Sequence, residues 1–384
     1  MNRVAVIGVG ITKFGEHWDR SLRDLILEAG IKAIEDANLD GKEIEAIYGG
    51  TMASGYMTKQ EHIGALIADY LGLNPIPSVR VEAACASGGL ALREAYLAVA
   101  GGIYDIVVAG GVEKMTDIQT EEVTVALGEA SDQEIELMQG VTFPALYALM
   151  ARRHMYEYGT TEEQMAAVAV KNHKNAAKNE YAQFQKEIKI EDVLNSKVVA
   201  DPLKVFDCSP ITDGAAAVVL ANMEIAKKYT DTPVEIIASS HATDTLAIQN
   251  RESLTSIKAT RIAAQNAYKQ AKVEPKDIKV CEVHDCFTIA EIIAIEDLGF
   301  FEKGKGGIAT LDGETEIGGK VAINTSGGLK GCGHPVGATG IKQAVEITMQ
   351  LRGDAGKRQV NAEIGMTHNV GGSGATCVIH IFKR

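Results

Sequence analysis

The sequence has no long apolar run and no excess of basic residues. None of its 384 residues lies in a stretch that approaches the roughly 20 apolar residues of a membrane span. Near the start, the apolar run from Val4 to Ile11 is short and soon followed by charged residues, which is unlike a signal peptide. Basic residues number 38 against 51 acidic ones, a net charge of −13. Nucleic acids and anionic membranes attract concentrated positive charge, so neither is expected as a partner. We expect a globular cytoplasmic protein.

Two familiar motifs are also missing. The six cysteines are scattered and none forms a Cys-x-x-Cys pair, which favours reduced thiols used singly over disulfides. Gly8-Val9-Gly10 begins like a dinucleotide-binding loop, but position 13 is Lys, so the third glycine is absent. We therefore expect no nucleotide site there.

Two segments of the chain repeat later in the same order. A buried strand, VAVIGVG, precedes an amphipathic helix from about Ser21 to Ala37 and then DGKEIEAIYGG. A second amphipathic helix, from about Thr255 to Ala271, precedes EPKDIKVCEVHD, and these segments align at an offset of 234. SGGLALREAYLAVAGG aligns with ATGIKQAVEITMQLRG at an offset of 251, which matches Gly89 with Gly340. The repetition predicts an internal duplication.

The predicted halves are residues 1–230 and 231–384, both rich in βαβ units. Residues from about 113 to 205 differ in composition, being charged, rich in Met and without a clear strand, so we interpret them as a helical segment inserted into the first half. An ordinary helical subdomain and a loop that covers a substrate explain this insertion equally well. Its basic residues that are weak candidates for binding a phosphate are Arg152, Arg153, Lys171 and Lys174.

The stretch VEAACASGGL places one cysteine, Cys85, among small residues directly before a helical pattern. Small neighbours leave room for a large group to approach the sulfur. A helix that begins there offers unpaired N–H groups, which favour a thiolate. Cys85 is therefore a candidate nucleophile.

The cluster CEVHDC resembles a metal site in composition. In an extended segment side chains alternate, so His284 and Cys286 share a face while Cys281 points the other way. This disfavours a three-ligand metal site and indicates a packed thiol at Cys281. His284 and Cys286 remain a candidate acid/base pair.

Two glycine-rich loops follow. NTSGGLKGCGHPVGATG fixes a single imidazole, His334, just before a helix, which makes it a candidate base. HNVGGSG precedes the last strand and is suited to present backbone N–H groups to an oxyanion. Cys377 and His380 in that strand, and Cys208, are interpreted as structural residues.

With these pieces assembled, the sequence resembles the thiolase family along essentially its whole length. VEAACASGG resembles the nucleophile loop, SPITDGAAAVVL the strand that closes the first half, and HMYEYGTTEEQ the start of the loop domain. GGLKGCGHPVGATG matches the Gly-His-Pro motif, and HDCF is typical of the sterol-carrier-protein type and of archaeal thiolases. Asn369 stands where most thiolases have a second catalytic cysteine, and in the HDCF branch that role is attributed to the cysteine that would be Cys286.

The resemblance implies a five-layered αβαβα fold of two similar halves, in a homodimer or homotetramer. It implies Cys85 as nucleophile, His334 as its base, and Cys286 as the base for the second substrate, with His284 and His334 at the enolate oxygen. The N–H groups of Cys85 and Gly371 would form an oxyanion hole, and Met155 would line the acyl pocket. Coenzyme A thioesters would be the substrates, with no tightly bound cofactor.

The implied reaction is the condensation of two acetyl-CoA molecules to acetoacetyl-CoA and CoA. The archaeal members feed hydroxymethylglutaryl-CoA synthase in the mevalonate pathway, and assemble with it through a small zinc-containing OB-fold protein. The alternatives are a thiolase-like scaffold without turnover and a condensing synthase of the ketoacyl or hydroxymethylglutaryl type.

Overall fold

Ten strands form one continuous sheet in the computed structural model, which describes residues 1–384. Its order is β10-β9-β11-β12-β8-β1-β7-β4-β2-β3. The strands from the first part of the chain are β1 (Val4–Ile11), β2 (Ala46–Gly50), β3 (Ser78–Val81), β4 (Ile106–Glu113) and β7 (Gly214–Asn222). Those from the second part are β8 (Val234–Thr243), β9 (Val280–Glu282), β10 (Ala322–Ile323), β11 (Ile364–Gly371) and β12 (Thr376–Lys383).

The sheet consists of two sets of five strands with the same pairing pattern. β1, β7 and β4 pair antiparallel in turn and β2 and β3 continue in parallel, while β8, β12, β11, β9 and β10 repeat this sequence of pairings. Only two residue pairs, Ala5–Glu235 and Val6–Val234, join β1 to β8. The duplication predicted from the sequence is therefore present in the fold.

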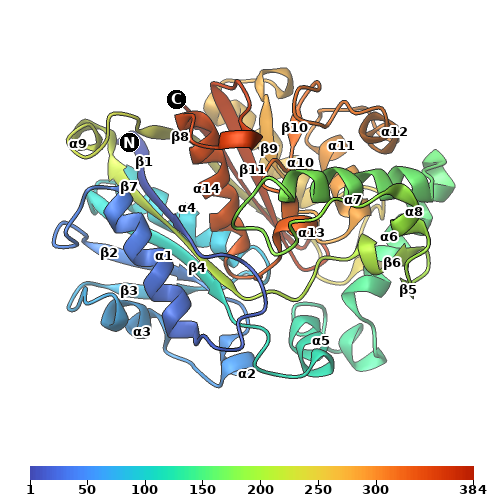
Figure 1. The fold of residues 1–384 in the computed structure, drawn as a ribbon, viewed down its shortest axis with the longest axis horizontal. Helices are drawn as coiled ribbons and strands as arrows, with labels where there is room; N and C mark the ends of the chain where they lie inside the picture. The colour runs from blue at the N-terminus through green and yellow to red at the C-terminus, as the bar shows by residue number, and fades with distance from the viewer.

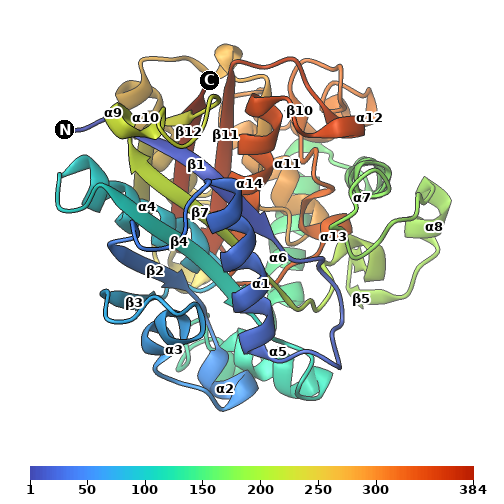
Figure 2. The same cartoon turned by 60° about the vertical axis from the view of Figure 1, so that its left-hand side comes forward.

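The longer helices form three layers around the two sets of strands (Figures 1 and 2). α1 (Leu22–Asp36) and α3 (Ile63–Tyr70) cover the outer face of the first set, and α10 (Lys258–Ala271) covers β8 and β12 of the second. α4 (Ser87–Ala100) and α14 (Thr339–Arg352) pack against each other between the sets. This is the five-layered arrangement that was predicted. The remaining helices are α2 (Ser54–Thr58), α5 (Thr120–Gly128), α6 (Phe143–Tyr158), α7 (Glu162–Ala176), α8 (Ile190–Leu194), α9 (Met223–Ala226), α11 (Thr288–Asp297), α12 (Gly306–Leu311) and α13 (Gly328–Cys332).

α4 and α14 touch through glycines at their first turns. A Cβ on Gly340 would lie 2.1 Å from the amide nitrogen of Gly89, and a Cβ on Gly88 would lie 2.6 Å from the carbonyl oxygen of Gly337. Gly89 and Gly340 are the residues matched by the offset of 251. Any larger side chain at these positions would force the two helix N-termini apart, so the glycines bring the two halves together.

Gly8 and Gly10 serve helix packing rather than nucleotide binding. A Cβ on either residue would lie 2.2 Å from a backbone oxygen of α1, that of Ala33 or Ala29. The glycines and the alanines thus allow α1 to approach β1 closely. α1 spans Leu22–Asp36, one residue shorter at each end than expected, because Ser21 caps its N-terminus in a capping box.

The segment between β4 and β7 is mainly helical, but the expectation that it contains no strand is wrong. β5 (Val198–Ala200) and β6 (Leu203–Lys204) pair as a short antiparallel ribbon. α7 of this segment packs against α11, α12 and α13 of the second half, and α6 packs against α11. The inserted segment therefore packs on helices of the second half, and its side chains contact that half.

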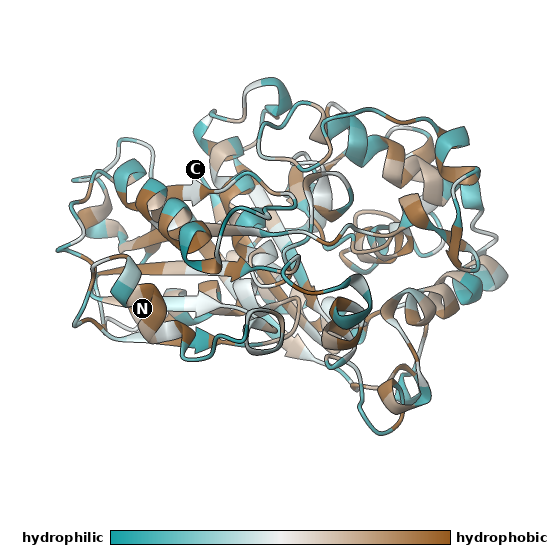
Figure 3. Ribbon diagram, turned by 60° about the horizontal axis from the view of Figure 1, so that its bottom comes forward, coloured by the Kyte–Doolittle hydropathy of each residue, from teal (hydrophilic) through white to brown (hydrophobic).

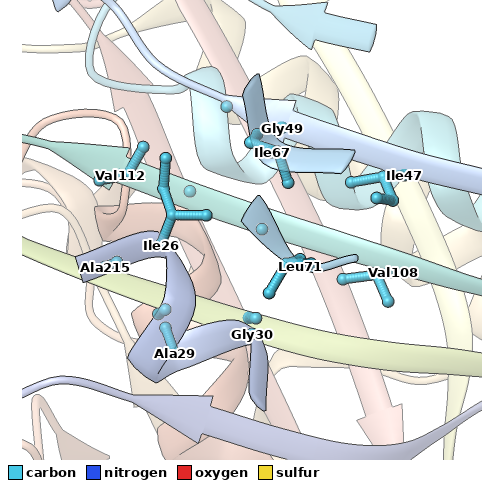
Figure 4. A pocket seen from close by; sticks show the side chains of 15 residues that line it. Ile26, Ala29, Gly30, Ile47, Gly49, Ile67, Leu71, Val108, Val112 and Ala215 are labelled. Atoms are coloured by element: carbon cyan, nitrogen blue, oxygen red, sulfur yellow. The ribbon is translucent and has the colours of Figure 1, made fainter. Parts of the chain in front are cut away.

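Apolar residues concentrate on the strands and on the inward faces of the helices (Figure 3). No helix is both long enough and apolar enough to cross a membrane. An apolar cavity lies between α1, α3 and the first set of strands, where Ile26, Ile67 and Leu71 point into it (Figure 4). None of the residues with predicted catalytic roles lines this cavity, so we interpret it as imperfect packing of the outer layer.

Candidate active site

Cys85 lies in the tight turn between β3 and α4. The preceding residue, Ala84, has φ of +51°, a left-handed conformation that is strained for alanine. Ser87 holds this turn, because its hydroxyl accepts a hydrogen bond from the Ala83 amide and donates one to the Ala84 carbonyl. Cys85 is 9% exposed. Burial raises the pKa of the Cys85 thiol to about 12, although hydrogen bonds from the amides of Gly372 and Cys85 itself lower this pKa. At neutral pH the sulfur is a thiol that requires a base.

His334 has a ring nitrogen suited to that task. It lies in the loop between α13 and α14, and its Nδ1 is 2.7 Å from the Thr339 hydroxyl oxygen. That hydroxyl donates its single hydrogen to the Pro335 carbonyl at 3.0 Å, so it accepts a hydrogen from Nδ1. Burial lowers the pKa of His334 to about 3, which keeps the ring neutral. The remaining nitrogen, Nε2, is therefore unprotonated and able to take a proton.

His284 carries its proton on the opposite nitrogen. Asn369 of β11 accepts a hydrogen bond from the Gly89 amide through Oδ1 at 3.1 Å, which fixes the orientation of its side-chain amide. Its Nδ2 then faces Nδ1 of His284 at 3.2 Å and can only donate, so Nδ1 is unprotonated. Burial lowers the pKa of His284 well below its usual value. Neutral His284 consequently presents Nε2–H, which has no hydrogen-bond partner in the protein.

Cys85, His284 and His334 converge. One ligand-type atom of each residue lies within 4.8 Å of those of the other two, and the two imidazole rings meet edge to face at 5.1 Å. Three such atoms also form a potential metal site, but the proton on Nε2 of His284 opposes metal binding there. Cys281, as predicted, is absent from this group and lies in the hydrophobic core. The arrangement offers a thiol, a base beside it and a hydrogen-bond donor.

Cys286 lies beside this group, in contact with a residue that the sequence did not reveal. Burial raises the pKa of Cys286 well above its usual value, and a hydrogen bond with Tyr147 of α6 lowers this pKa. Tyr147 also donates a hydrogen bond to the Gly372 carbonyl at 3.1 Å, and its ring packs on Phe287 with centroids 4.6 Å apart. No sequence pattern distinguishes Tyr147 from the other ten tyrosines.

Asp285 joins the segment of His284 to the loop of His334. Its carboxylate accepts hydrogen bonds from the amides of Leu329 and Lys330 in the first turn of α13, and from the side chain of Asn172. Burial and the neighbouring Glu291 raise the pKa of Asp285. Asp285 therefore connects the segment that carries His284 to α13, the helix that precedes His334 in the chain.

The expected oxyanion-hole residue Gly371 ends β11. A Cβ at this position would lie 2.4 Å from the Ala83 carbonyl oxygen, so the absence of a side chain lets β11 approach the Cys85 turn. The amide that bonds to the sulfur itself is that of Gly372, one residue further along. The role of the Gly371 amide at an acyl oxygen stays a prediction.

The expected acyl-pocket residue Met155 lies on α6, the helix that also carries Tyr147. Tyr147 contacts Cys286, and Met155 is eight residues further along the same helix, about 12 Å at 1.5 Å per residue. Met155 packs against the hydrophobic core that contains Tyr147 and Cys286. Its role in the acyl pocket stays a prediction.

The four cations proposed for phosphate binding do not form a cluster. Each is paired with a different acidic residue: Arg152 with Asp201, Arg153 with Glu157, Lys171 with Glu291 and Lys174 with Glu316. Lys171 is buried and bonds to the Ile323 carbonyl, which makes it a structural residue. These separate ion pairs give no support to a shared phosphate site, and the role of the exposed cations Arg152, Arg153 and Lys174 stays a prediction.

The remaining residues assigned to structural roles have such surroundings. Cys377 is buried in the core, Cys208 bonds through its thiol to the Lys204 carbonyl at 3.3 Å, and His380 lies 3.0 Å from the carbonyl oxygen of Gly89. None of the three is among the groups around Cys85.

Comparison with known proteins agrees with this geometry. The model of the thiolase N-terminal domain matches residues 4–224, and that of the thiolase C-terminal domain-like family matches residues 240–384. The chain belongs to the thiolase family. It is 61% identical to an acetyl-CoA acetyltransferase of Methanothermobacter thermautotrophicus, over all of both chains. It is 38% identical to sterol carrier protein 2 of Bos taurus, covering all of this chain and 72% of that protein.

A solved structure extends the thiolase comparison. The structure named Ltp2-ChsH2(DUF35) aldolase superposes with a TM-score of 0.86 at 27% identity, covering 99% of this chain and 97% of the other. The HDCF segment of this thiolase agrees with its similarity to sterol carrier protein 2.

Proposed function

We propose that this thiolase is an acetyl-CoA C-acetyltransferase, which condenses two acetyl-CoA molecules to acetoacetyl-CoA and CoA. The observation that carries the proposal is the pair of opposite imidazole tautomers beside Cys85. A bare Nε2 on His334 suits removal of a thiol proton, and Nε2–H on His284 suits stabilisation of an enolate oxygen. The acetyl-CoA acetyltransferase of 61% identity supports the choice of substrate.

In the first half-reaction, Nε2 of His334 takes the proton of Cys85, and the sulfur attacks the thioester carbonyl of acetyl-CoA. The N–H groups of Cys85 and Gly371 stabilise the resulting oxyanion, at roughly 3 kcal/mol for each donor. The carbon–sulfur bond to CoA breaks, and Cys286 gives its proton to the departing CoA thiolate. The products are acetyl-Cys85, CoA, protonated His334 and a Cys286 thiolate.

In the second half-reaction, the Cys286 thiolate removes an α-proton from a second acetyl-CoA. The enolate oxygen accepts hydrogen bonds from Nε2–H of His284 and of protonated His334. The α-carbon attacks the acetyl group, the bond to Cys85 breaks, and His334 returns its proton to the Cys85 thiolate. All protons then balance, and acetoacetyl-CoA is released.

The test is thiolytic cleavage of acetoacetyl-CoA with added CoA, followed by loss of the enolate absorbance. We expect the wild type to be active and both Cys85→Ala and Cys286→Ala to lose turnover. Cys286→Ala should still accept an acetyl group at Cys85, visible by mass spectrometry, because its nucleophile and base remain and water can protonate the departing CoA thiolate. Cys208→Ala is the matched control and should retain activity. A folded wild type without thiolytic activity on acetoacetyl-CoA or on longer 3-ketoacyl-CoAs would favour the scaffold hypothesis.

Partners belong to the same proposal. β3 is an edge strand with an open side, and its Val79 is 46% exposed, which supports pairing with a second copy of the chain in a dimer or tetramer. We further propose a cytoplasmic complex with hydroxymethylglutaryl-CoA synthase and a small zinc-containing OB-fold protein, serving the mevalonate pathway. The solved structure whose name joins Ltp2 to a DUF35 component supports association with an additional small protein. Purification of the chain without either partner from its native cell would contradict the complex.

A further inference from the structure

The hydroxyl of Tyr147 lies near both cysteines with proposed catalytic roles, and burial together with Cys286 raises the pKa of Tyr147. Tyr147 is 1% exposed and comes from α6, in the segment inserted between β4 and β7. Its oxygen has two polar neighbours: the Gly372 carbonyl oxygen at 3.1 Å and the thiol of Cys286. A phenol has one hydrogen to donate, so it cannot donate to both neighbours at once.

The protonation state of Cys286 decides which neighbour receives that hydrogen. When Cys286 is a thiol, the hydroxyl donates to the Gly372 carbonyl, as it does in the structure. When Cys286 is a thiolate it can only accept, and a hydrogen bond to an ionised acceptor is stronger than one to a neutral carbonyl. The hydroxyl hydrogen then rotates from the carbonyl to the sulfur.

We propose that Tyr147 is a positioning residue for the second half-reaction, where its rotating hydroxyl stabilises the Cys286 thiolate that removes the α-proton. This inference rests on the proposed function. No bond other than hydrogen bonds changes at Tyr147, and the hydroxyl keeps its proton throughout.

The surroundings of Tyr147 allow the hydroxyl hydrogen to turn while the ring stays in place. The ring packs on Phe287, the residue that follows Cys286, with an interplanar angle of 30°. On the other side, Arg251 donates hydrogen bonds to the carbonyl and the hydroxyl of Ser373, which fixes the residue after Gly372. Both partners of the hydroxyl are thus held at constant positions.

Gly372 connects Tyr147 to the first cysteine as well. Its amide bonds to the sulfur of Cys85, and its carbonyl accepts from Tyr147. The backbone of one residue therefore separates the hydroxyl from the nucleophile. We assign the effect of Tyr147 to Cys286, because Cys286 is the neighbour of the hydroxyl that acts as a base and becomes a thiolate in the proposed mechanism.

The experiment compares two partial reactions in Tyr147→Phe, which keeps the ring and removes the hydroxyl. Exchange of labelled CoA into acetyl-CoA reports acylation of Cys85, and thiolysis of acetoacetyl-CoA reports the complete cycle. Washout of deuterium from the methyl group of labelled acetyl-CoA reports α-proton removal. We expect deuterium washout and kcat to fall roughly 10- to 100-fold, with KM unchanged. CoA exchange should fall less than about threefold, because water can also protonate the departing CoA thiolate, whereas removal of the α-proton requires the Cys286 base.

Tyr156→Phe is the matched control, since Tyr156 lies on the same helix and is 83% exposed. It should behave as the wild type in all three assays. Unchanged deuterium washout in Tyr147→Phe, or an equal loss of CoA exchange and washout with an unaltered thermal unfolding temperature, would overturn the inference. A wild type without CoA exchange would instead contradict the proposed function itself.

Discussion

Asn369 donates a hydrogen bond from Nδ2 to the backbone carbonyl of Cys85 at 3.0 Å, across 284 residues of sequence. The same side chain accepts from the Gly89 amide and faces Nδ1 of His284. One amide thus fixes the nucleophile turn, the start of α4 and the tautomer of His284. At the position where most thiolases have a catalytic cysteine, this chain has a residue that holds other groups in place.

Replacement of Asn369 by Asp should lower kcat while the fold persists. A carboxylate of the same shape accepts from Gly89 but cannot donate to Cys85 or His284, and its charge opposes a thiolate at Cys85. We expect kcat for thiolysis to fall about 10- to 100-fold, equivalent to about 1.4 to 2.8 kcal/mol. Asn175→Asp, at a buried asparagine that donates to the Asn324 carbonyl, is the control away from the cysteines. Full activity in Asn369→Asp would contradict the assigned tautomer of His284.

Gly340→Ala should destabilise the protein strongly. The added Cβ would lie 2.1 Å from the Gly89 nitrogen and 2.2 Å from Oδ1 of Asn369, where only backbone and a fixed amide could yield. We expect a loss of about 3 kcal/mol or more in the free energy of unfolding, measured by denaturant titration. Gly15→Ala has no neighbour closer than 3.9 Å to its new Cβ, so it should change stability by about 0.5 kcal/mol at most. Equal stability of the two variants would show that α4 and α14 can separate without cost.

Asp285→Ala should reduce stability and activity together. The amides of Leu329 and Lys330 and the side-chain amide of Asn172 would lose their acceptor in a buried site. We expect a loss of about 2 to 4 kcal/mol in the free energy of unfolding and reduced acetylation of Cys85, because His334 follows α13 in the chain. Denaturant titration and mass spectrometry of the acetylated protein would measure the two effects. Normal acetylation of Cys85 in a destabilised Asp285→Ala variant would show that Asp285 does not determine the position of His334.

Acid should unfold the protein through its buried histidines. Burial lowers the pKa of His173 and His380 to about 4, and that of His334 and His368 to about 3, against about 6.5 in an unfolded chain. The unfolded state therefore binds more protons in this range. Stability is fully present above pH 6.5 and falls as the pH drops towards 3 to 4. At pH 5.5 each imidazole costs about 1.4 kcal/mol, and the four together about 5.6 kcal/mol.

Denaturant titrations at pH 7.5 and 5.5 would measure this loss. In His380→Gln, an amide can still donate to the Gly89 carbonyl without taking up a proton. The dependence of stability on pH should therefore become shallower by about one proton. Stability that is constant between these two values of pH would mean that the imidazoles can ionise within the fold.

The fold could be predicted from the sequence because the internal repeat leaves a recurring local pattern of small residues. Ala29 and Ala33 recur as Ala263 and Ala267, and all four are buried under their helices against the strands. The sequence also pointed to Cys85, His284 and His334, which the structure brings together, because each stands in a short motif whose residue types suit acyl transfer. Their catalytic roles stay predictions.

The sequence did not reveal contacts that depend on distant packing. Tyr147 reaches Cys286 only because α6 lies above the second half, and no local pattern encodes the direction of its hydroxyl. Arg152 and Lys174 were recognised as cations, but their acidic partners, Asp201 and Glu316, are fixed by the tertiary structure. Met155 was assigned to the acyl pocket by motif similarity alone, and that role stays a prediction.

The glycine contact between α4 and α14 has a consequence for how the duplicated chain divides its chemistry. The offset of 251 that relates Gly89 to Gly340 sets Val336 opposite Cys85 and Ala83 opposite His334. Under the proposed function, each repeat supplies one of the two reacting side chains where its counterpart has an inert one. Neither repeat by itself would contain both the nucleophile and its base, so turnover would depend on the contact between α4 and α14 that joins the repeats.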